Sequence, residues 1–402
     1  MSGERGRGAL HGVTVLDLSR VMAGPWAGQV FAQLGARVIK VERPEVGDDT
    51  RHWGPPFVGP DAAGRRGDAA YYLSVNSGKE SVTADLTTAG GQALVRSLIP
   101  STDIVLENFR VGTLARYGLD HESMAELNPG IVFCSITGFG QDGPRRDEAA
   151  YDFLIQAMSG LMSVTGEPDD VPGGGPEKVG VPIIDLMTGM YAAVACLAAL
   201  DRRRRTGMGE AIDVAMLDVG VALLANRASG YLTSGDEPVR TGNAHPQIQP
   251  QDVYATGDGR LAVVVGNDGQ FMRLCASLGD VGLGTDPRFA TNAGRVAHRA
   301  ELKAALERLL RRKGARDWAA VLTSAGVPAG PINTVSQALR DKQTLHRDMV
   351  RETVDAAGRS IRVLRAPFRF ARAGLPELTA PPLLGEHDRS LSSAATPNIG
   401  GD

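Results

Sequence analysis

Apolar residues in the first 140 positions form short continuous runs, separated by longer stretches with helical spacing. Short apolar runs between turn residues are typical of buried strands in a parallel sheet, and the stretches between them are typical of crossover helices. This β-α-β alternation predicts an α/β fold whose parallel sheet is covered by helices on both faces. The strands are expected at residues 12–19, 36–42, 103–109 and 131–140, and the helices at 25–35 and 91–99.

The second half of the chain changes its pattern near residue 230. Before that point, two helical stretches, a strand-like run and a further helix are expected at 151–164, 182–206, 210–216 and up to about 233. After it, a hairpin is expected to turn at Asp258-Gly259, because Asp-Gly between apolar runs favours a tight turn. The remaining expected elements are a surface loop at 44–70, helices at 270–278, 296–313 and 316–325, a turn-rich exit at 326–333, and a strand at 361–370.

A chain of 402 residues has enough material for two domains. The order of the elements predicts a large Rossmann-like parallel-sheet domain formed first by residues 1–229. A small α+β domain is expected at 230–335, and residues 336–402 are expected to return to the large domain.

The charge balance excludes several classes of partner. The chain has 43 basic and 46 acidic residues, which predicts neither nucleic-acid nor membrane-surface binding. Its three cysteines are far apart in apolar surroundings, and its seven histidines form no HxxxH or HExxH pair, so no metal site is predicted. The first ten residues contain no apolar signal-peptide core. A cytoplasmic protein is expected.

One acid stands in a strongly apolar run. Asp185 is the only charged residue between Val179 and Leu200. The run has about the length of a membrane span, but Asp185, Pro182 and several small residues favour a buried helix of a soluble protein.

Burying an isolated carboxylate costs several kcal/mol, so such a residue usually has a partner or a task. Pro182 favours the first helical turn, which places Asp185 near the positive end of the helix dipole. Two interpretations stay open from these residues alone. Asp185 is either a structural acid that caps the start of a helix or a reactive carboxylate.

The first β-α-β unit has some features of a dinucleotide site. Gly24 and Gly28 follow the first strand, and Glu42 closes the second. Their spacing is G-x-x-x-G rather than G-x-G-x-x-G, so nicotinamide binding is not favoured. A helix start at Pro25 would still offer free N–H groups to a phosphate. Basic residues near the expected strand ends, which suit phosphates and carboxylates, are Arg43, Lys79, Arg110 and Arg116. Because no G-x-S-x-G elbow or Cys–His pair is present, serine- or cysteine-type acyl transfer is not predicted.

Taken together, the chain resembles the class III CoA-transferases of the CaiB/BaiF type, the family of formyl-CoA and carnitinyl-CoA transferases. The resemblance covers nearly the whole chain and rests on segments that occur in the family's order. These are residues 17–44, 81–86, 107–119, 128–144, 151–166, 181–200, 206–218, 242–254, 326–335 and 381–387.

The resemblance implies a function for Asp185, which matches the family's nucleophilic aspartate in the segment IIDLMTG. The implied enzyme moves CoA from an acyl-CoA thioester to a free carboxylic acid through acyl-aspartyl anhydride and aspartyl-CoA thioester intermediates. It implies an acyl-CoA and a carboxylic acid as substrates, no permanently bound cofactor, and an interlocked homodimer.

The resemblance also implies a set of CoA contacts, among which Arg43 and Arg116 match phosphate partners. The positions that carry over are Met22, Ala23, Arg43, Ala84, Asn108, Phe109, Arg110, Arg116, Ala149, Ala150, Tyr151 and Asp152. Three departures argue against formyl or oxalate specificity: Glu80 replaces a basic contact, Thr87 replaces a lysine, and a tetraglycine loop is missing. The segments HPQIQP and PAGPIN are more similar to the branch that uses succinyl-CoA.

Two alternatives share this fold. The α-methylacyl-CoA racemases carry a His-Asp pair where this chain has Tyr151-Asp152. Tyrosine, with an ordinary pKa of about 10, is a poor base at neutral pH, so this position disfavours a racemase. A non-catalytic acyl-CoA-binding protein is the other alternative, and the retained Asp185 disfavours it.

Overall fold

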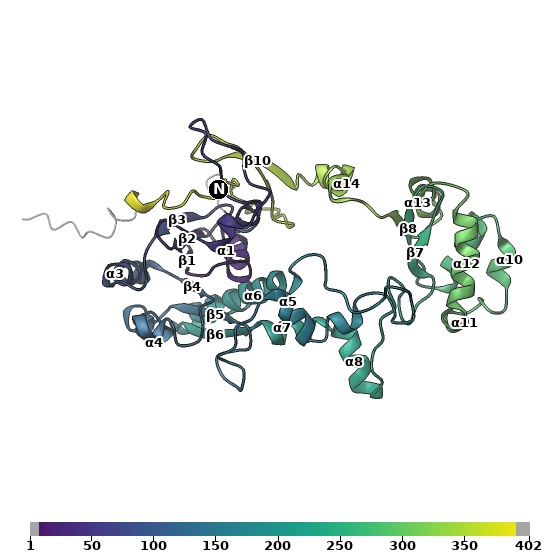
Figure 1. Ribbon diagram of the computed structural model, residues 1–402, viewed down its shortest axis with the longest axis horizontal. Helices are drawn as coiled ribbons and strands as arrows, with labels where there is room; N and C mark the ends of the chain where they lie inside the picture. The colour runs from purple at the N-terminus through teal and green to yellow at the C-terminus, as the bar shows by residue number, and fades with distance from the viewer. Residues whose placement is uncertain (1–7, 391–402) are drawn as a thin grey trace, which may run out of the picture. The chain divides into compact units, whose positions relative to one another are not determined.

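A computed structural model describes residues 8–390, which divide into two compact units. The larger unit contains residues 8–161, 179–225 and 342–390, and the smaller unit contains residues 162–178 and 226–341. The colour gradient in Figure 1 follows the chain as it passes between the units. The expected divisions after residues 229 and 335 lie within a few residues of two of these crossings. Residues 162–178, expected in the large domain, belong to the smaller unit by their contacts.

A six-stranded parallel sheet forms the centre of the larger unit, in the order β3-β2-β1-β4-β5-β6. The α/β fold expected from the sequence is therefore confirmed. The order reverses between β1 and β4, and in open α/β sheets ligands bind at such a point, outside the carboxyl ends of the strands. The strands are β1 (Thr14–Asp17), β2 (Arg37–Glu42), β3 (Glu80–Thr83), β4 (Ile104–Glu107), β5 (Val132–Thr137) and β6 (Glu210–Ala215).

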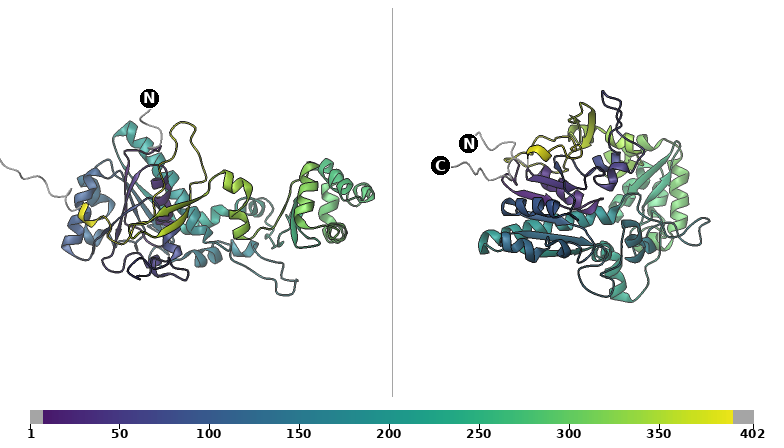
Figure 2. Two further views of the ribbon diagram at one scale, coloured as in Figure 1. Left: turned by 90° about the horizontal axis from the view of Figure 1, so that it is seen from above. Right: turned by 60° about the vertical axis from the view of Figure 1, so that its left-hand side comes forward.

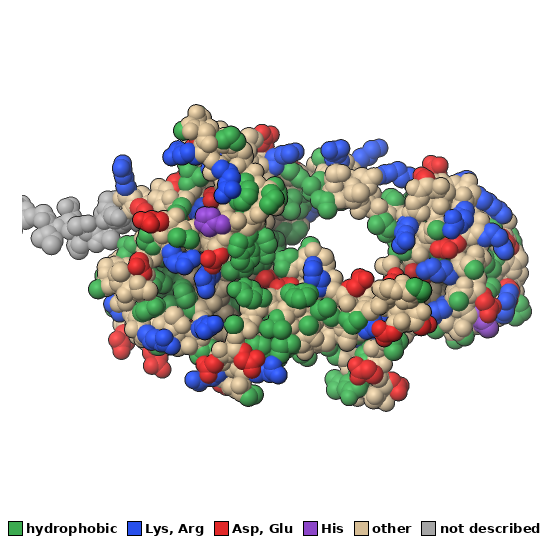
Figure 3. Space-filling model, in the orientation of Figure 1, with side chains coloured by type: hydrophobic (Ala, Val, Ile, Leu, Met, Phe, Trp, Pro, Cys, Tyr) green, Lys and Arg blue, Asp and Glu red, His purple; other side chains and the backbone are tan. Residues whose placement is uncertain are grey.

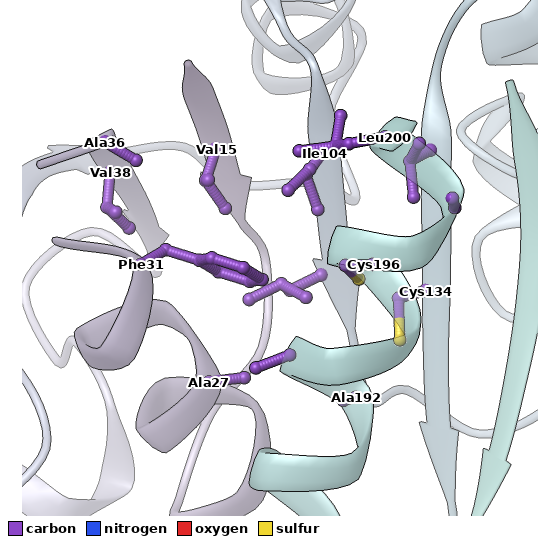
Figure 4. Packing of buried hydrophobic residues seen from close by; sticks show 14 of the residues in the cluster. Val15, Ala27, Phe31, Ala36, Val38, Ile104, Cys134, Ala192, Cys196 and Leu200 are labelled. Atoms are coloured by element: carbon purple, nitrogen blue, oxygen red, sulfur yellow. The ribbon is translucent and has the colours of Figure 1, made fainter. Parts of the chain in front are cut away.

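Helices cover both faces of the sheet, as Figures 1 and 2 show. Successive strand residues point to opposite faces, so Val15 packs with α1 and α6, whereas Leu16 packs with α3 and α4. Figure 4 shows the first of these clusters, in which Phe31 of α1 and Cys196 of α6 meet the strands. The helices are α1 (Ala23–Gln33), α3 (Ala89–Leu98), α4 (His121–Leu127) and α6 (Ile183–Thr206).

The longest helix, α6, is the one helix among the described residues that is long and apolar enough to cross a membrane. Its residues Ala192, Cys196 and Leu200 are instead buried in the core beside the sheet. The expected core helix is therefore confirmed by its packing. Figure 3 shows basic and acidic side chains interspersed over the face it draws, in line with the balanced composition.

Close contact between α1 and α6 requires a glycine at position 189. A Cβ there would lie 2.4 Å from the backbone oxygen of Ala23. We expect Gly189→Ala to lower the free energy of unfolding by about 1–3 kcal/mol, because the two backbones must move apart. Gly230 of α8 (Ala225–Ser234) has nothing within 4 Å of the same position, so Gly230→Ala is the matched control. Thermal unfolding of both variants measures the difference, and equal midpoints would contradict the packing argument.

The remaining elements of the larger unit are short. The C-terminal strands β10 and β11 pair in an antiparallel hairpin, of which only the second was expected from the sequence. These elements are η1 (Asp49–His52), α2 (Ala70–Leu73), η2 (Ile99–Ser101), η3 (Ala115–Tyr117), α5 (Asp152–Met158), α7 (Met216–Leu223), α15 (Lys342–His346), β10 (Val350–Val354) and β11 (Ser360–Leu364).

The smaller unit combines a three-stranded antiparallel sheet with helices around a core that includes Phe271 and Trp318. The expected hairpin is confirmed as β7 and β8. The exit at 326–333 was expected without a strand, which is wrong, because β9 pairs with β8 there. The single helix expected at 296–313 breaks at His298. The elements are η4 (Met162–Val164), α8, β7 (Gln251–Ala255), β8 (Arg260–Val264), α9 (Asp268–Ser277), α10 (Val281–Thr285), α11 (Asn292–Ala297), α12 (Arg299–Leu310), α13 (Ala315–Ser324), β9 (Ala329–Pro331) and α14 (Val335–Leu339).

Candidate active site

A cavity of about 520 Å³ opens in the larger unit where the strand order reverses. Its walls come from the loops that follow β1 and β4, from the end of β5, and from the start of α6. The side chains of Arg20, Met22, Asn108, Arg110, Arg146, Tyr151 and Asp185 are among those that line it.

Asp185 lies in the first turn of α6, three residues after the N-cap residue Pro182. Its side chain is half-buried and lines the cavity. Burial raises the pKa of this carboxyl to about 7, and the negative charge of Asp152 contributes to the shift. No hydrogen bond to the Asp185 carboxylate comes from any of residues 8–390. The group is therefore available to a ligand in the cavity.

Asp152, rather than Asp185, caps the start of α6. One carboxylate oxygen of Asp152, Oδ2, accepts the backbone N–H groups of Ile184 at 2.7 Å and Asp185 at 3.1 Å. The other oxygen accepts the side-chain amide of Gln156 at 2.5 Å, and Gln156 in turn accepts the N–H of Val179 at 2.9 Å. The structural capping role that the sequence left open for Asp185 is thus taken by a residue on the preceding helix.

Two aromatic residues near Asp185 were not identified from the sequence. Trp53 lines the cavity, and its ring meets that of Tyr71 edge to face at a centroid distance of 5.3 Å. Burial raises the pKa of Tyr71 to about 12, and the charge of Asp185 adds to this effect. Trp53 lies in the Gly- and Pro-rich tract at 44–70 that was expected only as a surface loop. The presence of a tryptophan in such a tract was the only sequence signal that could have indicated a role in the site.

A second cavity of about 260 Å³ adjoins the first, since Arg20 and Phe109 line both. Of the positions matched to CoA contacts, Arg116 and Asp152 line neither cavity. Arg116 is exposed beside Tyr117, which lines the second cavity. The first cavity is lined by Met22, Ala23, Asn108, Phe109, Arg110, Ala149, Ala150 and Tyr151, and the second by Arg43, Ala84 and Phe109.

Arg43 and Arg20 share one carboxylate, that of Asp49. Their guanidinium groups lie 2.9 Å and 3.0 Å from its two oxygens. Both arginine side chains are more than half exposed, and exposed ion pairs contribute little to stability. Either arginine is therefore free to exchange Asp49 for an anionic ligand at a small cost.

Lys79 does not offer its ammonium group to an anionic ligand, although its place near a strand end suggested this. Its ammonium group is fully buried and binds Asp17 at 2.8 Å, the backbone oxygen of Pro25 at 2.8 Å and Asn76 at 2.9 Å. Burial lowers the pKa of Lys79 to about 8. Every donor of this lysine is used within the protein, so its role is structural.

The dinucleotide pattern also has a structural explanation. A Cβ at Gly28 would lie 2.8 Å from Asp17 Oδ2 and 3.0 Å from Lys79 Nζ, so glycine leaves room for this buried ion pair. Glu42 is buried and binds Arg51 at 2.7 Å and Ser81 at 2.7 Å. Its carboxylate is bound by partners within the fold rather than being placed to bind the ribose of a dinucleotide.

Among residues 8–390, no three His, Cys, Asp or Glu side chains gather in a group that would hold a metal ion. The three cysteines are all buried and free. The cavity combines the Asp185 carboxylate, which accepts no hydrogen bond from residues 8–390, with arginines on its walls and the Trp53–Tyr71 ring pair near the carboxylate.

Comparison with known proteins identifies the class of enzyme that this fold and cavity define. The chain belongs to CoA-transferase family III, whose family model matches residues 10–388. It is an enzyme that transfers CoA between an acyl-CoA thioester and a free carboxylic acid. The resemblance found in the sequence is thereby confirmed.

The similar proteins include relatives named as CoA-transferases and a solved structure. A succinate–glutarate CoA-transferase from Agrobacterium fabrum is 48% identical over 382 residues, which are 95% of this chain and 94% of that protein. A succinyl-CoA:glutarate CoA-transferase from Mus musculus is 40% identical over 382 residues, covering 95% of this chain and 85% of that protein. The crystal structure of a CaiB/BaiF family protein from Brucella suis superposes with a TM-score of 0.87 at 47% identity, covering 97% of this chain and 100% of that one.

Proposed function

We propose that the chain moves CoA from succinyl-CoA to a second dicarboxylic acid such as glutarate, with Asp185 as the nucleophile. The observation that carries this proposal is the half-buried carboxylate of Asp185, which lines the cavity without a hydrogen bond from residues 8–390. The similar transferases named for succinate and glutarate support this pair of acids. Arg20, Arg110 and Arg146 on the same walls suit substrates with a second carboxylate.

The first half of the reaction cleaves the donor thioester. A carboxylate oxygen of Asp185 attacks the thioester carbonyl carbon, the C–S bond breaks, and CoA thiolate leaves an acyl-aspartyl anhydride. The thiolate then attacks the aspartyl carbonyl carbon of the anhydride. The C–O bond breaks, so the donor acid departs as a carboxylate and Asp185 carries CoA as a thioester. Dividing the exchange in this way replaces one difficult step by easier ones.

The second half reverses this order with the acceptor acid. Its carboxylate attacks the aspartyl thioester, giving a new anhydride and free thiolate. The thiolate attacks the acceptor carbonyl carbon, which forms the new acyl-CoA and restores the Asp185 carboxylate. No proton is gained or lost overall, and the proposed cycle requires neither a metal nor a permanently bound cofactor.

The two adjoining cavities supply the proposed binding path for CoA. Arg43 and Ala84 at the smaller cavity are proposed to bind the nucleotide end, and Arg116 is proposed to reach a phosphate from the exposed η3 turn. Residues 108–110 and 149–151 line the larger cavity, along which the pantetheine arm would reach Asp185. Asp152, which lines neither cavity, is proposed to position Asp185 rather than to contact CoA.

Trapping of the covalent intermediates tests this function. The protein is incubated with succinyl-CoA and hydroxylamine, digested, and examined by peptide mass spectrometry. We expect a hydroxamate on the peptide that contains Asp185, because hydroxylamine attacks both the anhydride and the aspartyl thioester. A hydroxamate on another residue would refute the assignment. A panel of free acids measured with succinyl-CoA identifies the acceptor, and α-proton exchange in D₂O without an acceptor would instead indicate a racemase.

The rate of CoA exchange is expected to depend on pH through Asp185. Burial, reinforced by the charge of Asp152, raises the pKa of this group to about 7. Only the carboxylate is nucleophilic, so kcat/KM is expected to be constant above this pKa and to fall about tenfold per pH unit below it. Initial rates at constant ionic strength over a pH series measure this limb. A limb at the ordinary aspartate pKa, near pH 4, would contradict the environment described for Asp185.

We also propose that the enzyme is a homodimer in the cytoplasm, without nucleic-acid or membrane partners. Large apolar side chains stand exposed on α5, α6 and α7 of the larger unit, among them Phe153, Tyr191, Val194 and Val221. Apolar side chains gathered in this way favour a protein partner, and a second copy of the chain is the partner proposed. Light scattering after size exclusion is expected to give twice the mass of one chain, and a fully active monomer would refute the dimer.

A further inference from the structure

The turn between β1 and α1 contains a strained residue on the wall of the cavity. Val21 has φ of 73°, a left-handed conformation that is costly for a β-branched residue. It lines the cavity together with Arg20, Met22 and Ala23. Strain of this kind persists only where the surroundings fix the backbone. The contacts of this turn therefore show what holds it.

The backbone N–H of Val21 is held by the buried ion pair of Lys40 and Asp48. The N–H of Val21 donates to both carboxylate oxygens of Asp48, at 3.3 Å and 3.2 Å. Asp48 in turn lies 2.9 Å from the ammonium group of Lys40, with side-chain exposures of 1% for Lys40 and 0% for Asp48. Burial alone would raise the pKa of Asp48, but Lys40 and Thr50 hold it at about 2. The pair is thus ionised throughout the range of an enzyme assay.

The neighbouring backbone groups of the turn are fixed as well. Lys40 donates to the backbone oxygen of Ser19 at 2.8 Å. The side-chain amide of Asn108 accepts the N–H of Arg20 at 3.0 Å and donates to its oxygen at 2.7 Å. Three consecutive residues are therefore held by side chains from other elements. Such redundancy is typical of a wall that must keep its shape before a ligand binds.

We propose that Lys40 and Asp48 are positioning residues for CoA exchange, which hold Val21 in its left-handed conformation and so shape the cavity wall at the start of α1. Neither side chain lines the cavity that contains Asp185, whereas both line the smaller adjoining cavity as an almost fully buried pair. Their proposed effect on the cavity of Asp185 passes through the turn that contains Val21. This inference rests on the proposed function, because it assigns the turn to the cavity of the proposed nucleophile.

Glycine at position 21 provides the decisive test, since it adopts positive φ without a steric penalty. Asp48→Ala is expected to lower kcat/KM for acyl-CoA by about 10- to 100-fold, the range typical of lost positioning. Adding Val21→Gly to this variant is expected to recover most of the loss, relative to Val21→Gly alone. If the variants affected only stability, activity would follow the unfolding midpoint, so Tm is measured for each.

Glu45 supplies the matched control. It also has a positive φ, 64°, but it does not line the cavity. Glu45→Gly relieves similar strain and is expected to recover nothing in the Asp48→Ala background. If Asp48→Ala does not fold, Thr50→Val replaces it, because it removes only the 2.7 Å hydrogen bond from the Thr50 hydroxyl to Asp48. A smaller loss, again reversed by Val21→Gly, is then expected. Failure of Val21→Gly to recover activity, or equal recovery by Glu45→Gly, overturns the proposal.

Failure of the proposed function would be recognised separately, by a wild-type protein that turns over no acyl-CoA. The hydrogen bonds from the Val21 N–H to Asp48 would then be tested by deuterium exchange of the Val21 amide. Exchange at least tenfold faster in Asp48→Ala, or in Thr50→Val if that variant is used, is the expected result. Unchanged exchange would overturn the proposal that Asp48 holds Val21, whatever reaction the enzyme catalyses.

Discussion

Asp185→Ala is expected to abolish CoA exchange, with kcat lowered by about 10⁴-fold or more, while the fold is retained. Removing a covalent nucleophile removes the step on which the other groups act, so its loss is not compensated by the remaining binding energy. Substitution also removes a half-buried ionisable group with a raised pKa, so stability is expected to stay the same or to increase. Exchange rates and thermal unfolding are measured on the same preparation.

Asp201 provides a matched control on the same helix. It is exposed near the other end of α6 and pairs with Arg205 one turn later. Asp201→Ala is therefore expected to keep wild-type exchange rates. Full activity in Asp185→Ala, or equal losses in the two variants, would refute the nucleophile. Asp185→Asn, which keeps the shape of the side chain, is expected to be as inactive as Asp185→Ala.

Asp152→Ala is expected to lower kcat by about 10- to 100-fold although Asp152 does not line the cavity. Its carboxylate accepts the N–H groups of Ile184 and Asp185, so its loss leaves the first turn of α6 without its cap. Loss of a helix cap typically costs about 1 kcal/mol of stability. Because Asp185 is in this turn, the same change also displaces the nucleophile. Steady-state rates and chemical unfolding separate the two effects.

Asp152→Asn distinguishes position from charge. The amide keeps an oxygen that accepts the N–H groups of α6. Asp152→Asn is therefore expected to retain most of the activity that Asp152→Ala loses. The negative charge beside Asp185 disappears, which favours the ionised form of Asp185 and lowers its pKa. The acid limb of the pH profile should therefore move to lower pH. A limb that stays in place would refute the electrostatic effect of Asp152.

The parallel sheet was largely predictable because its central strands are nearly continuous apolar runs. β1, β2, β4 and β5 were identified for this reason. Short strands with polar or turn-forming residues gave no such pattern. β3 contains Glu80 and Ser81, β9 is Ala-Gly-Pro, and β10 has three polar residues in a row between its two valines, so all three were missed. In these cases, pairing with a neighbouring strand, rather than local preference, fixes the structure.

Single residues of the site were harder to interpret than the fold. The sequence marked Asp185 as unusual, because no other charge occurs in its apolar run. It did not show that Asp152 caps α6, since that contact joins residues 32 positions apart. Lys79 and Glu42 stood at strand ends, but their buried partners Asp17 and Arg51 come from other elements. Charge and position in the chain do not reveal which side chains are already paired within the fold.

The path of the chain between Asp152 and Asp185 has a consequence for redesign of this enzyme. Both aspartates belong to the larger unit, whereas residues 162–178 between them belong to the smaller one. The hydrogen bonds from Ile184 and Asp185 to Asp152 therefore close a long loop whose middle takes no part in the contact. Changes in the length of such a loop cost little, because closure entropy grows only slowly with length. Insertions or deletions within residues 162–178 are therefore expected to leave the contact of Asp152 with the start of α6 intact.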